Sequence, residues 1–217
     1  MSTSQRRMRS EGRIPVLVAQ LVAFALILSL PGAVLPLLVR CVAVVIAASV
    51  LLPLLIVDPS RLRHSSRRTR RLGVSQAGFL AVVALAAVAL TVVQLVTASY
   101  ALVPRVLVGA VGAWLLQVIA ASLVLWQLDR GGPVARRGIR SGPHPDPDLR
   151  FPQEDLEERW MPSYLDYVTT ALTNAMAVVP ARTLALRPRT KILTSIWSFT
   201  SFALLGVVVA RIIAFVA

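Results

Sequence analysis

The stretch SQAGFLAVVALAAVALTVVQLVTA, residues 75–98, decides the fold. It runs for 24 residues without an Asp, Glu, Lys or Arg. A helix needs about 20 predominantly apolar residues to cross the hydrocarbon core of a bilayer. The stretch therefore predicts a transmembrane helix, and it places the chain among integral membrane proteins.

Further apolar runs lie on both sides of this one. They are Ile14–Leu30, Pro36–Val57, Pro104–Leu128 and Ile192–Val216. Hydrophobic residues make up 56% of the 217-residue chain and charged residues only 15%, against about 25% in soluble domains, which excludes an ordinary soluble protein. We therefore expect an all-α, polytopic transmembrane helical bundle with about five spans.

The basic residues predict the orientation of these spans. The chain has 23 Lys and Arg against 10 Asp and Glu, a formal charge of +13. Twenty of the 23 lie in residues 1–13, 58–73, 129–159 and 181–191. Because Lys and Arg concentrate in cytoplasmic loops, we expect a multi-pass protein of the plasma (inner) membrane with a cytoplasmic N-terminus.

This orientation divides the chain into four parts. Residues 1–13 are a basic cytoplasmic N-terminus and 14–128 a four-helix transmembrane region. Residues 129–160 are a cytoplasmic loop, and 161–217 hold a half-helix and the final transmembrane helix.

The loop at 58–73 is the most basic segment of the chain. Its arginines are Arg61, Arg63, Arg67, Arg68, Arg70 and Arg71. Such a run can bind nucleic acid or anionic lipid. The loop has no aromatic residues among its arginines, so we interpret it as a topology determinant that contacts anionic headgroups. Membrane lipids are the expected partners, and nucleic acid is not.

The segment MPSYLDYVTTALTNAMAVVP, residues 161–180, does not fit a simple span. On a helix, Asp166, Thr169, Thr170 and Thr173 would share one face. About 15 helical residues give roughly 22 Å, which is less than the hydrocarbon thickness. A full span would also place the basic residues 182–191 outside the cell. The charge pattern therefore favours a re-entrant or interfacial half-helix over a sixth span.

Three elements of the C-terminal half resemble a known family. They are WQLDRGGPVAR (Trp126–Arg136), DLRFPQ (Asp148–Gln153) and YLDYVTTALTNAMAVVPARTLALRPRTKIL (Tyr164–Leu193). Together they resemble a family of uncharacterised actinobacterial integral membrane proteins. In that family this region is similar in layout to the pore module of tetrameric potassium channels. The resemblance implies a pore helix, a filter segment and an inner helix.

The chain departs from the channel pattern at the filter. A potassium filter needs a TVGYG-like strand, whose carbonyls replace the ion's hydration shell. Residues 174–180, NAMAVVP, contain no glycine. We therefore do not expect potassium selectivity by that mechanism.

Two functions follow as hypotheses. The first is a channel-like, pore-forming homo-oligomer that passes an inorganic ion, lined by Thr169, Thr170, Thr173 and Asn174. The second is a non-conducting membrane scaffold or accessory protein that docks a cytoplasmic partner. A small-solute transporter is disfavoured because the five runs show no internal repeat.

Residues for catalysis or metal binding are sparse. The sequence has no HExxH, GxSxG or P-loop motif, one cysteine (Cys41) and two histidines (His64 and His144). His144 precedes Asp146 and Asp148 but has no second histidine near it. We expect no metal site, no cofactor and no enzymatic activity.

Polar residues also occur within the apolar runs. Gln20, Gln94 and Gln117 are the largest of them. Such groups usually hydrogen-bond across helices in a membrane, so we expect them at helix contacts.

Overall fold

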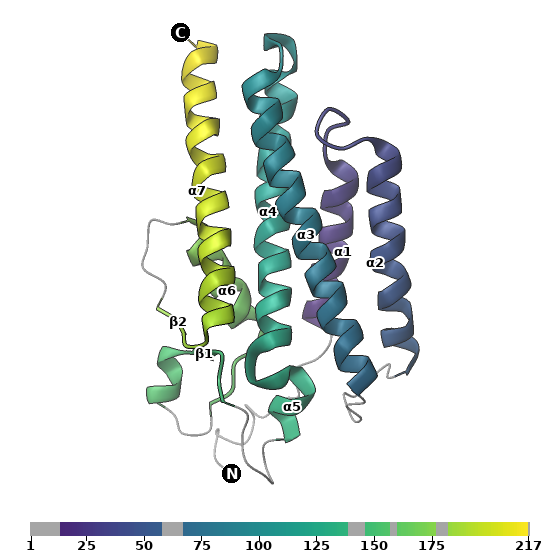
Figure 1. Ribbon diagram of the computed structural model, residues 1–217, viewed down its shortest axis with the longest axis vertical. Helices are drawn as coiled ribbons and strands as arrows, with labels where there is room; N and C mark the ends of the chain where they lie inside the picture. Colours follow the sequence, from purple (N-terminus) through teal and green to yellow (C-terminus); the bar gives the residue numbers. More distant parts are fainter. Residues whose placement is uncertain (1–13, 58–66, 139–145, 157–159, 177–181, 217) are drawn as a thin grey trace, which may run out of the picture.

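The computed structural model is all-α apart from one short strand pair, and it describes residues 14–57, 67–138, 146–156, 160–176 and 182–216. Figure 1 shows long helices that run side by side along one axis. The α-helices are α1 (Ile14–Ser29), α2 (Leu37–Val57), α3 (Arg67–Thr97), α4 (Val103–Leu128), α5 (Pro133–Gly138), α6 (Tyr164–Met176) and α7 (Pro188–Val216). The short elements are η2 (Tyr100–Leu102), η3 (Asp129–Gly131), η5 (Pro152–Asp155), β1 (Leu149–Arg150) and β2 (Leu184–Ala185).

Helix α4 forms the centre of this bundle. It packs against α1, α3, α6 and α7. In the apolar 18-residue stretch of α4 that could cross a membrane, 61% is buried, whereas only 11% of the corresponding stretch of α7 is buried. Helix α7 is therefore a peripheral helix that leaves most of its apolar surface uncovered.

Among the described residues, three helical segments are long and apolar enough to cross a membrane, judged by length and composition. They are Arg70–Thr97, Val103–Gly131 and Pro188–Val216. Ile14–Ser29 and Leu37–Leu51 are shorter apolar helices. The bundle thus has the hydropathy of a multi-pass membrane protein.

The predicted and the observed helix boundaries differ most at the start of α3. The sequence predicted a loop over residues 58–73, but α3 already begins at Arg67, so the loop prediction was wrong for residues 67–73. Arginine has a high helix propensity, and extending a helix that has already formed costs little. The side chains of Arg70 and Arg71 are exposed on this extension. Arg61 and Arg63 lie outside the described residues, as do the side chains of Arg67 and Arg68.

The turn between α1 and α2 packs closely against α4. A Cβ on Gly109 would lie 2.7 Å from both Cγ and Cδ of Pro31. Arg40 of α2 donates to the carbonyls of Leu28 and Leu30, at the end of α1. A basic side chain therefore caps the unpaired carbonyls of α1, as is favourable at a helix C-terminus.

The LDRGGP element forms a tight turn after α4. Arg130, Gly131 and Gly132 all have positive φ angles, of 50°, 76° and 97°. A Cβ on Gly132 would lie 3.1 Å from the carbonyl oxygen of Gln127. Glycine tolerates this backbone at little steric cost, so the two glycines turn the chain back and bring α5 against the end of α4.

Helix α6 is short, and the chain on its two sides lies at one end of the bundle. Its 13 residues span about 20 Å and pack against both α4 and α7. Strand β1 precedes α6 and pairs antiparallel with β2, which follows it, with Leu149 opposite Ala185. We call this end, made of residues 129–138, 146–156 and 182–187, the polar end (Figure 1, bottom).

Candidate functional site

Asp129 lies at the centre of a buried polar cluster at the polar end. Its side chain is fully buried. One carboxylate oxygen, Oδ1, accepts hydrogen bonds from the backbone N–H groups of Asp148, at 3.0 Å, and Leu149, at 3.2 Å. The other, Oδ2, accepts one from the Tyr167 hydroxyl at 2.6 Å. One carboxylate thus joins the end of α4, strand β1 and helix α6.

Asp148 is the second buried acid of this cluster, and it is bound by α7. Its two carboxylate oxygens accept from Nε and Nη2 of Arg189, both at 2.7 Å. Thr190 donates its hydroxyl to Oδ1 at 3.3 Å. The paired arrangement of guanidinium and carboxylate fixes orientation as well as distance. It holds the first turn of α7 against the chain that precedes α6.

Arg136 supplies a buried positive charge on the other side of Asp129. Its side chain is 3% exposed, and Nη1 donates to the carbonyls of Trp126 and Asp129, both at 2.9 Å. The guanidinium carbon lies 5.8 Å from the Trp126 ring centroid and 5.1 Å from that of Tyr167. These distances are typical of cation–π contacts. Two buried acids therefore lie with Arg136 inside the bundle and with Arg189 at its surface, where 47% of the Arg189 side chain is exposed. We call Asp129, Arg136, Asp148, Tyr167 and Arg189 the aspartate cluster.

Aromatic side chains enclose the aspartate cluster. The Phe151 ring lies 5.5 Å from the Tyr167 ring, edge to face, and 5.4 Å from the ring of Trp160. The Tyr164 hydroxyl and the Ser122 hydroxyl on α4 are 2.8 Å apart. The FPQ and YLDY elements thus supply aromatic contacts to the buried part of the cluster, whereas 47% of the Arg189 side chain is exposed.

Ion pairs at the surface surround this interior. Arg187 pairs with Asp146 and Arg150 with Asp155, and all four side chains are at least 40% exposed. The pair of Arg130 and Glu154 is different, because these side chains are only 15% and 22% exposed and Nε of Arg130 also lies 3.8 Å from Oδ2 of Asp129. The hydrogen bond from Arg150 to Asp155 raises the pKa of the arginine, which is charged at any physiological pH in any case. Exposed pairs of this kind contribute little to stability, so the buried pairs define the site.

The predicted pore-lining residues do not all lie on one exposed face. Thr170 is buried, whereas Thr169 is exposed and Thr173 and Asn174 are half-buried. The three threonine hydroxyls donate to backbone carbonyls of α6 itself: Thr169 to Leu165, Thr170 to Asp166, and Thr173 to Thr169 and Thr170. Their polar atoms are therefore satisfied without a bound ion.

Asn174 connects α6 to α7 through its backbone. Its carbonyl oxygen accepts from the Ser198 hydroxyl at 2.9 Å. At the other end of α6, Asp166 accepts from the backbone N–H and the hydroxyl of Ser163, both at 2.7 Å. The short helix is thus capped at its start and bonded to its neighbour near its end.

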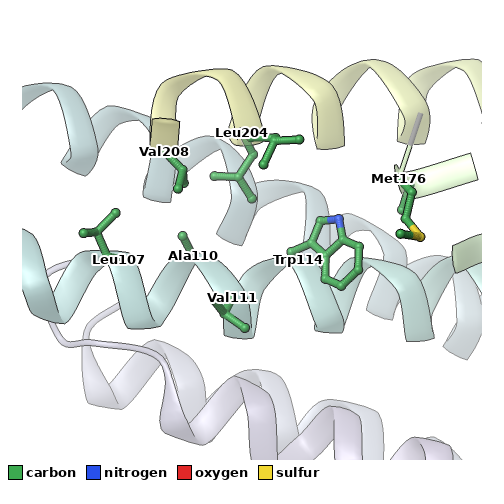
Figure 2. Close-up of a pocket in the computed structure, with 9 residues that line it drawn as sticks. Leu107, Ala110, Val111, Trp114, Met176, Leu204 and Val208 are labelled. Carbon is green, nitrogen blue, oxygen red and sulfur yellow. The ribbon is translucent and has the colours of Figure 1, made fainter. Parts of the chain in front are cut away.

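An apolar pocket lies beyond the C-terminal end of α6, between α4 and α7. Its volume is about 410 Å³. Figure 2 shows Leu107 and Val208 at one end of the pocket and Trp114 and Met176 at the other. The lining residues are Leu107, Ala110, Val111, Trp114, Ala175, Met176, Leu204, Leu205 and Val208. The pocket exists because α6 stops partway along its two longer neighbours.

Gln117 joins α4 to α7 within the apolar part of the bundle. Its Nε2 lies 2.9 Å from the Trp197 carbonyl, the Thr200 hydroxyl and the Ser201 hydroxyl. For Gln117 the expected contact across helices is confirmed. Gln20 is also buried, but its Oε1 has no hydrogen-bond partner among the described residues.

The described residues contain no group of three His, Cys, Asp or Glu side chains that could hold a metal ion. His64 and His144 lie outside the described part of the chain. Asp146 and Asp148, which follow His144 in sequence, are instead paired with Arg187 and Arg189.

The sequence interpretation missed the aspartate cluster as a site. A usable signal was Asp129, an acid placed directly after an apolar span and before a double glycine. The three elements that carry the family resemblance supply all its members. No family model, curated protein or solved structure matches the chain.

Proposed function

We propose that the chain is a multi-pass plasma-membrane protein with five spans, formed by α1–α4 and α7. Three of these helices have the length and composition of full spans, and α1 and α2 are apolar but shorter. A short helix can span by local thinning of the bilayer or by tilt of its neighbours, at modest cost. The starts of α1, α3 and α7 and the end of α4 lie at the same end of the bundle (Figure 1), and each of them adjoins a basic segment in the sequence. The positive-inside rule makes this polar end cytoplasmic.

In this arrangement α6 is a re-entrant half-helix. The pairing of β1 with β2 supports the proposal, because it keeps the chain on both sides of α6 at the polar end. Ala175 and Met176, at the end of α6, line the pocket together with Trp114, which lies near the middle of α4. The tip of α6 would therefore lie near the centre of the bilayer.

We propose further that the protein is a channel-like, pore-forming homo-oligomer without a potassium filter. The observation that carries this is the uncovered edge of the half-helix, where Thr169 is exposed and Thr173 is partly exposed. A helix end at membrane depth is tolerated where protein or a water-filled cavity covers it. A second copy of the chain against this edge would provide that cover, and several copies would surround a path lined by hydroxyl groups. An inorganic ion is the proposed conducted species, and no enzymatic activity is part of this proposal.

A single experiment tests conduction and its location together. The purified protein is reconstituted into liposomes, and ion flux is measured for the native chain, Thr173→Leu and Ser49→Leu. Ser49 is a matched control because its exposed hydroxyl also donates to its own helix, at the Ile46 carbonyl of α2. We expect flux for the native chain and Ser49→Leu, and its loss in Thr173→Leu. An absence of flux from a native preparation that runs as a monomer would overturn the proposal.

Cysteine labelling tests the topology separately. Arg182 is exposed at the start of the described segment that follows α6, and Cys41 can be replaced by serine to leave one reporter. We expect Arg182→Cys to react with an impermeant maleimide only from the cytoplasmic side. Labelling from the outside alone would make α6 part of a full span.

The second candidate is a non-conducting scaffold or accessory protein that docks a cytoplasmic partner. The apolar lining of the pocket favours it, because a conduit through the same chain would need polar groups there. The family resemblance is compatible with both candidates. Native chains that assemble, give no flux and retain a cytoplasmic partner through the polar end would support this second function.

A further inference from the structure

Four basic side chains lie between residue 182 and the first turn of α7, and only two of them are paired with an acid. Arg187 and Arg189 pair with aspartates of the loop that precedes α6. Arg182 and Lys191 are exposed, and their side chains make no ion pair with any residue that the structure describes. These two charges can therefore attract an anion from outside the chain.

The acids near this segment already have partners. Those that the structure describes are Asp129, Asp146, Asp148, Glu154, Asp155 and Asp166. Each of them accepts a hydrogen bond from an arginine, a hydroxyl or a backbone N–H group. The local charge around Arg182 and Lys191 is thus positive, because the charges of paired groups cancel and theirs do not.

Arg182 is held beside α6 by its neighbour Thr183. The hydroxyl oxygens of Thr183 and Thr170 are 3.1 Å apart, and Thr170 lies in the middle of α6. Residues 182–186 alternate between exposed and half-buried side chains, as in an extended segment. Since Thr183 points toward α6, Arg182 and Leu184 lie on the opposite, exposed side of the segment.

Lys191 lies on the face of α7 that packs against α6. It precedes Ser198 by seven residues, about two turns, so the two side chains share this face. Ser198 donates to the Asn174 carbonyl at 2.9 Å, and each of these two residues comes ten residues after the first residue of its helix. The two helices therefore start at about the same level. Lys191 lies about one helical turn closer to the polar end than Thr170 does.

Exposed apolar side chains adjoin both cations. Leu184 is 56% exposed on the same side as Arg182, and Ile192, next to Lys191, is 60% exposed. The long apolar run of α7 begins at Ile192, so in the proposed placement this level is the boundary between headgroups and hydrocarbon. A free phosphate ion has no apolar part to contact these side chains, whereas a phospholipid has both a phosphate and an apolar part.

We infer that Arg182 and Lys191 bind the phosphate of an anionic phospholipid, whose glycerol and first methylenes contact Leu184 and Ile192. The two cations select an anionic headgroup over a zwitterionic one, because a zwitterionic headgroup brings a positive charge of its own. The long stems of both side chains allow their charged ends to reach the same phosphate. This inference rests on the proposed membrane placement but not on conduction.

Native mass spectrometry of the full chain in detergent measures this binding directly. The protein is titrated with phosphatidylglycerol or with phosphatidylcholine of the same acyl chains, and the fraction that carries one lipid is followed. We expect phosphatidylglycerol to bind about 30-fold more tightly, which corresponds to ~1 kcal/mol for each of two basic residues near a headgroup. The measurement needs neither ion flux nor a defined orientation in a bilayer.

Substitutions of the two cations separate their contributions. Arg182→Gln and Lys191→Gln should each reduce the preference to about fivefold, because one cation remains, and the double variant should abolish it. Arg182→Lys keeps the charge and should retain most of the preference. Arg187→Gln is the matched control, because it removes a positive charge of the same segment that Asp146 already pairs. It should bind both lipids as the native chain does.

Equal binding of the two lipids by the native chain would overturn the inference. So would a loss of preference in Arg187→Gln as large as that in Arg182→Gln, because any positive charge would then serve. Displacement of phosphatidylglycerol by an equal concentration of inorganic phosphate would assign the site to a free anion and contradict a lipid site. Ion flux in liposomes keeps the outcomes apart, because selective lipid binding without flux supports the lipid site and contradicts only the channel.

Discussion

The two halves of the bundle hold their helices together by opposite means. At the polar end, α4, α5, α6 and α7 meet around two buried carboxylates that are hydrogen-bonded on every side. In the other half, α4 and α7 are separated by an apolar pocket of about 410 Å³. Directional bonds therefore position the polar end, whereas the other half is positioned by packing that leaves space unfilled. A site that must keep its shape fits the first region, and one that admits a flexible ligand fits the second.

The largest effect should come from removing the central carboxylate. Asp129→Ala leaves the Tyr167 hydroxyl and two backbone N–H groups without their acceptor, and it removes the carboxylate that lies 3.8 Å from Nε of Arg130. Breaking a buried, hydrogen-bonded charge in this way costs about 3–5 kcal/mol. Unfolding in mixed detergent micelles, followed by tryptophan fluorescence, measures the loss.

Asp146→Ala is the matched control for this variant. Asp146 is an acid of the same loop that pairs with Arg187, but its side chain is 87% exposed. It should unfold as the native chain does. If Asp146→Ala destabilised the protein as much as Asp129→Ala does, the burial of the Asp129 carboxylate would not explain the loss of stability.

The contact between α4 and the turn after α1 gives the next largest effect. Gly109→Ala places a Cβ 2.7 Å from Pro31, so it should destabilise the protein by about 1–3 kcal/mol through overpacking. Ala110→Val, one residue further and at the pocket, adds two methyl groups where space exists. It should leave the same unfolding transition nearly unchanged. Equal loss in the two variants would show that the pocket is closed.

A smaller effect is expected at the polar contact between α4 and α7. Gln117→Leu removes the hydrogen bonds to Trp197, Thr200 and Ser201, and it should cost about 0.6 kcal/mol, the average for such contacts in a membrane. Gln94→Leu on α3 is the control, because the Gln94 side chain makes no hydrogen bond among the described residues. A loss of several kcal/mol for Gln117→Leu would instead make this contact comparable with the aspartate cluster.

The smallest effect should come from the exposed pair of Arg150 and Asp155. Both side chains are more than half exposed, at 54% and 60%. Solvent screens such a pair, so Arg150→Ala should give an unfolding transition that cannot be distinguished from the native one. The unfolding transitions of the native chain and of Arg150→Ala should also coincide at both low and high salt. A marked salt dependence that the variant abolishes would contradict this expectation.

Much of the fold was predictable because a long apolar run by itself specifies a helix. The run at 75–98 lies in α3 except for its last residue, Ala98, and the runs at 104–128 and 192–216 nearly coincide with α4 and α7. The short helix predicted within residues 161–180 is α6, Tyr164–Met176. The start of α3 was missed because helix propensity extended the helix into arginines that contribute nothing to the hydropathy signal.

The site was less predictable, because hydropathy says nothing about which polar residues meet. Thr169, Thr170, Thr173 and Asn174 were chosen from their polarity on a short helix. In the structure the threonine hydroxyls donate to carbonyls of α6 itself, and Thr170 is buried. Asp129 and Asp148 are 19 residues apart, and Arg189 lies 41 residues beyond Asp148. Only a chain that turns at Gly131 and Gly132 and pairs β1 with β2 brings them together.

The sequence by itself determined the class of protein, the approximate helices and the end of the bundle at which the charge collects. These follow from composition and length, since each apolar run is long enough to specify its own helix. The tertiary structure alone decided which acids are buried against which arginines, and where α6 stops between α4 and α7. Those outcomes depend on contacts between distant segments, and no local property of Asp129 or Met176 encodes them.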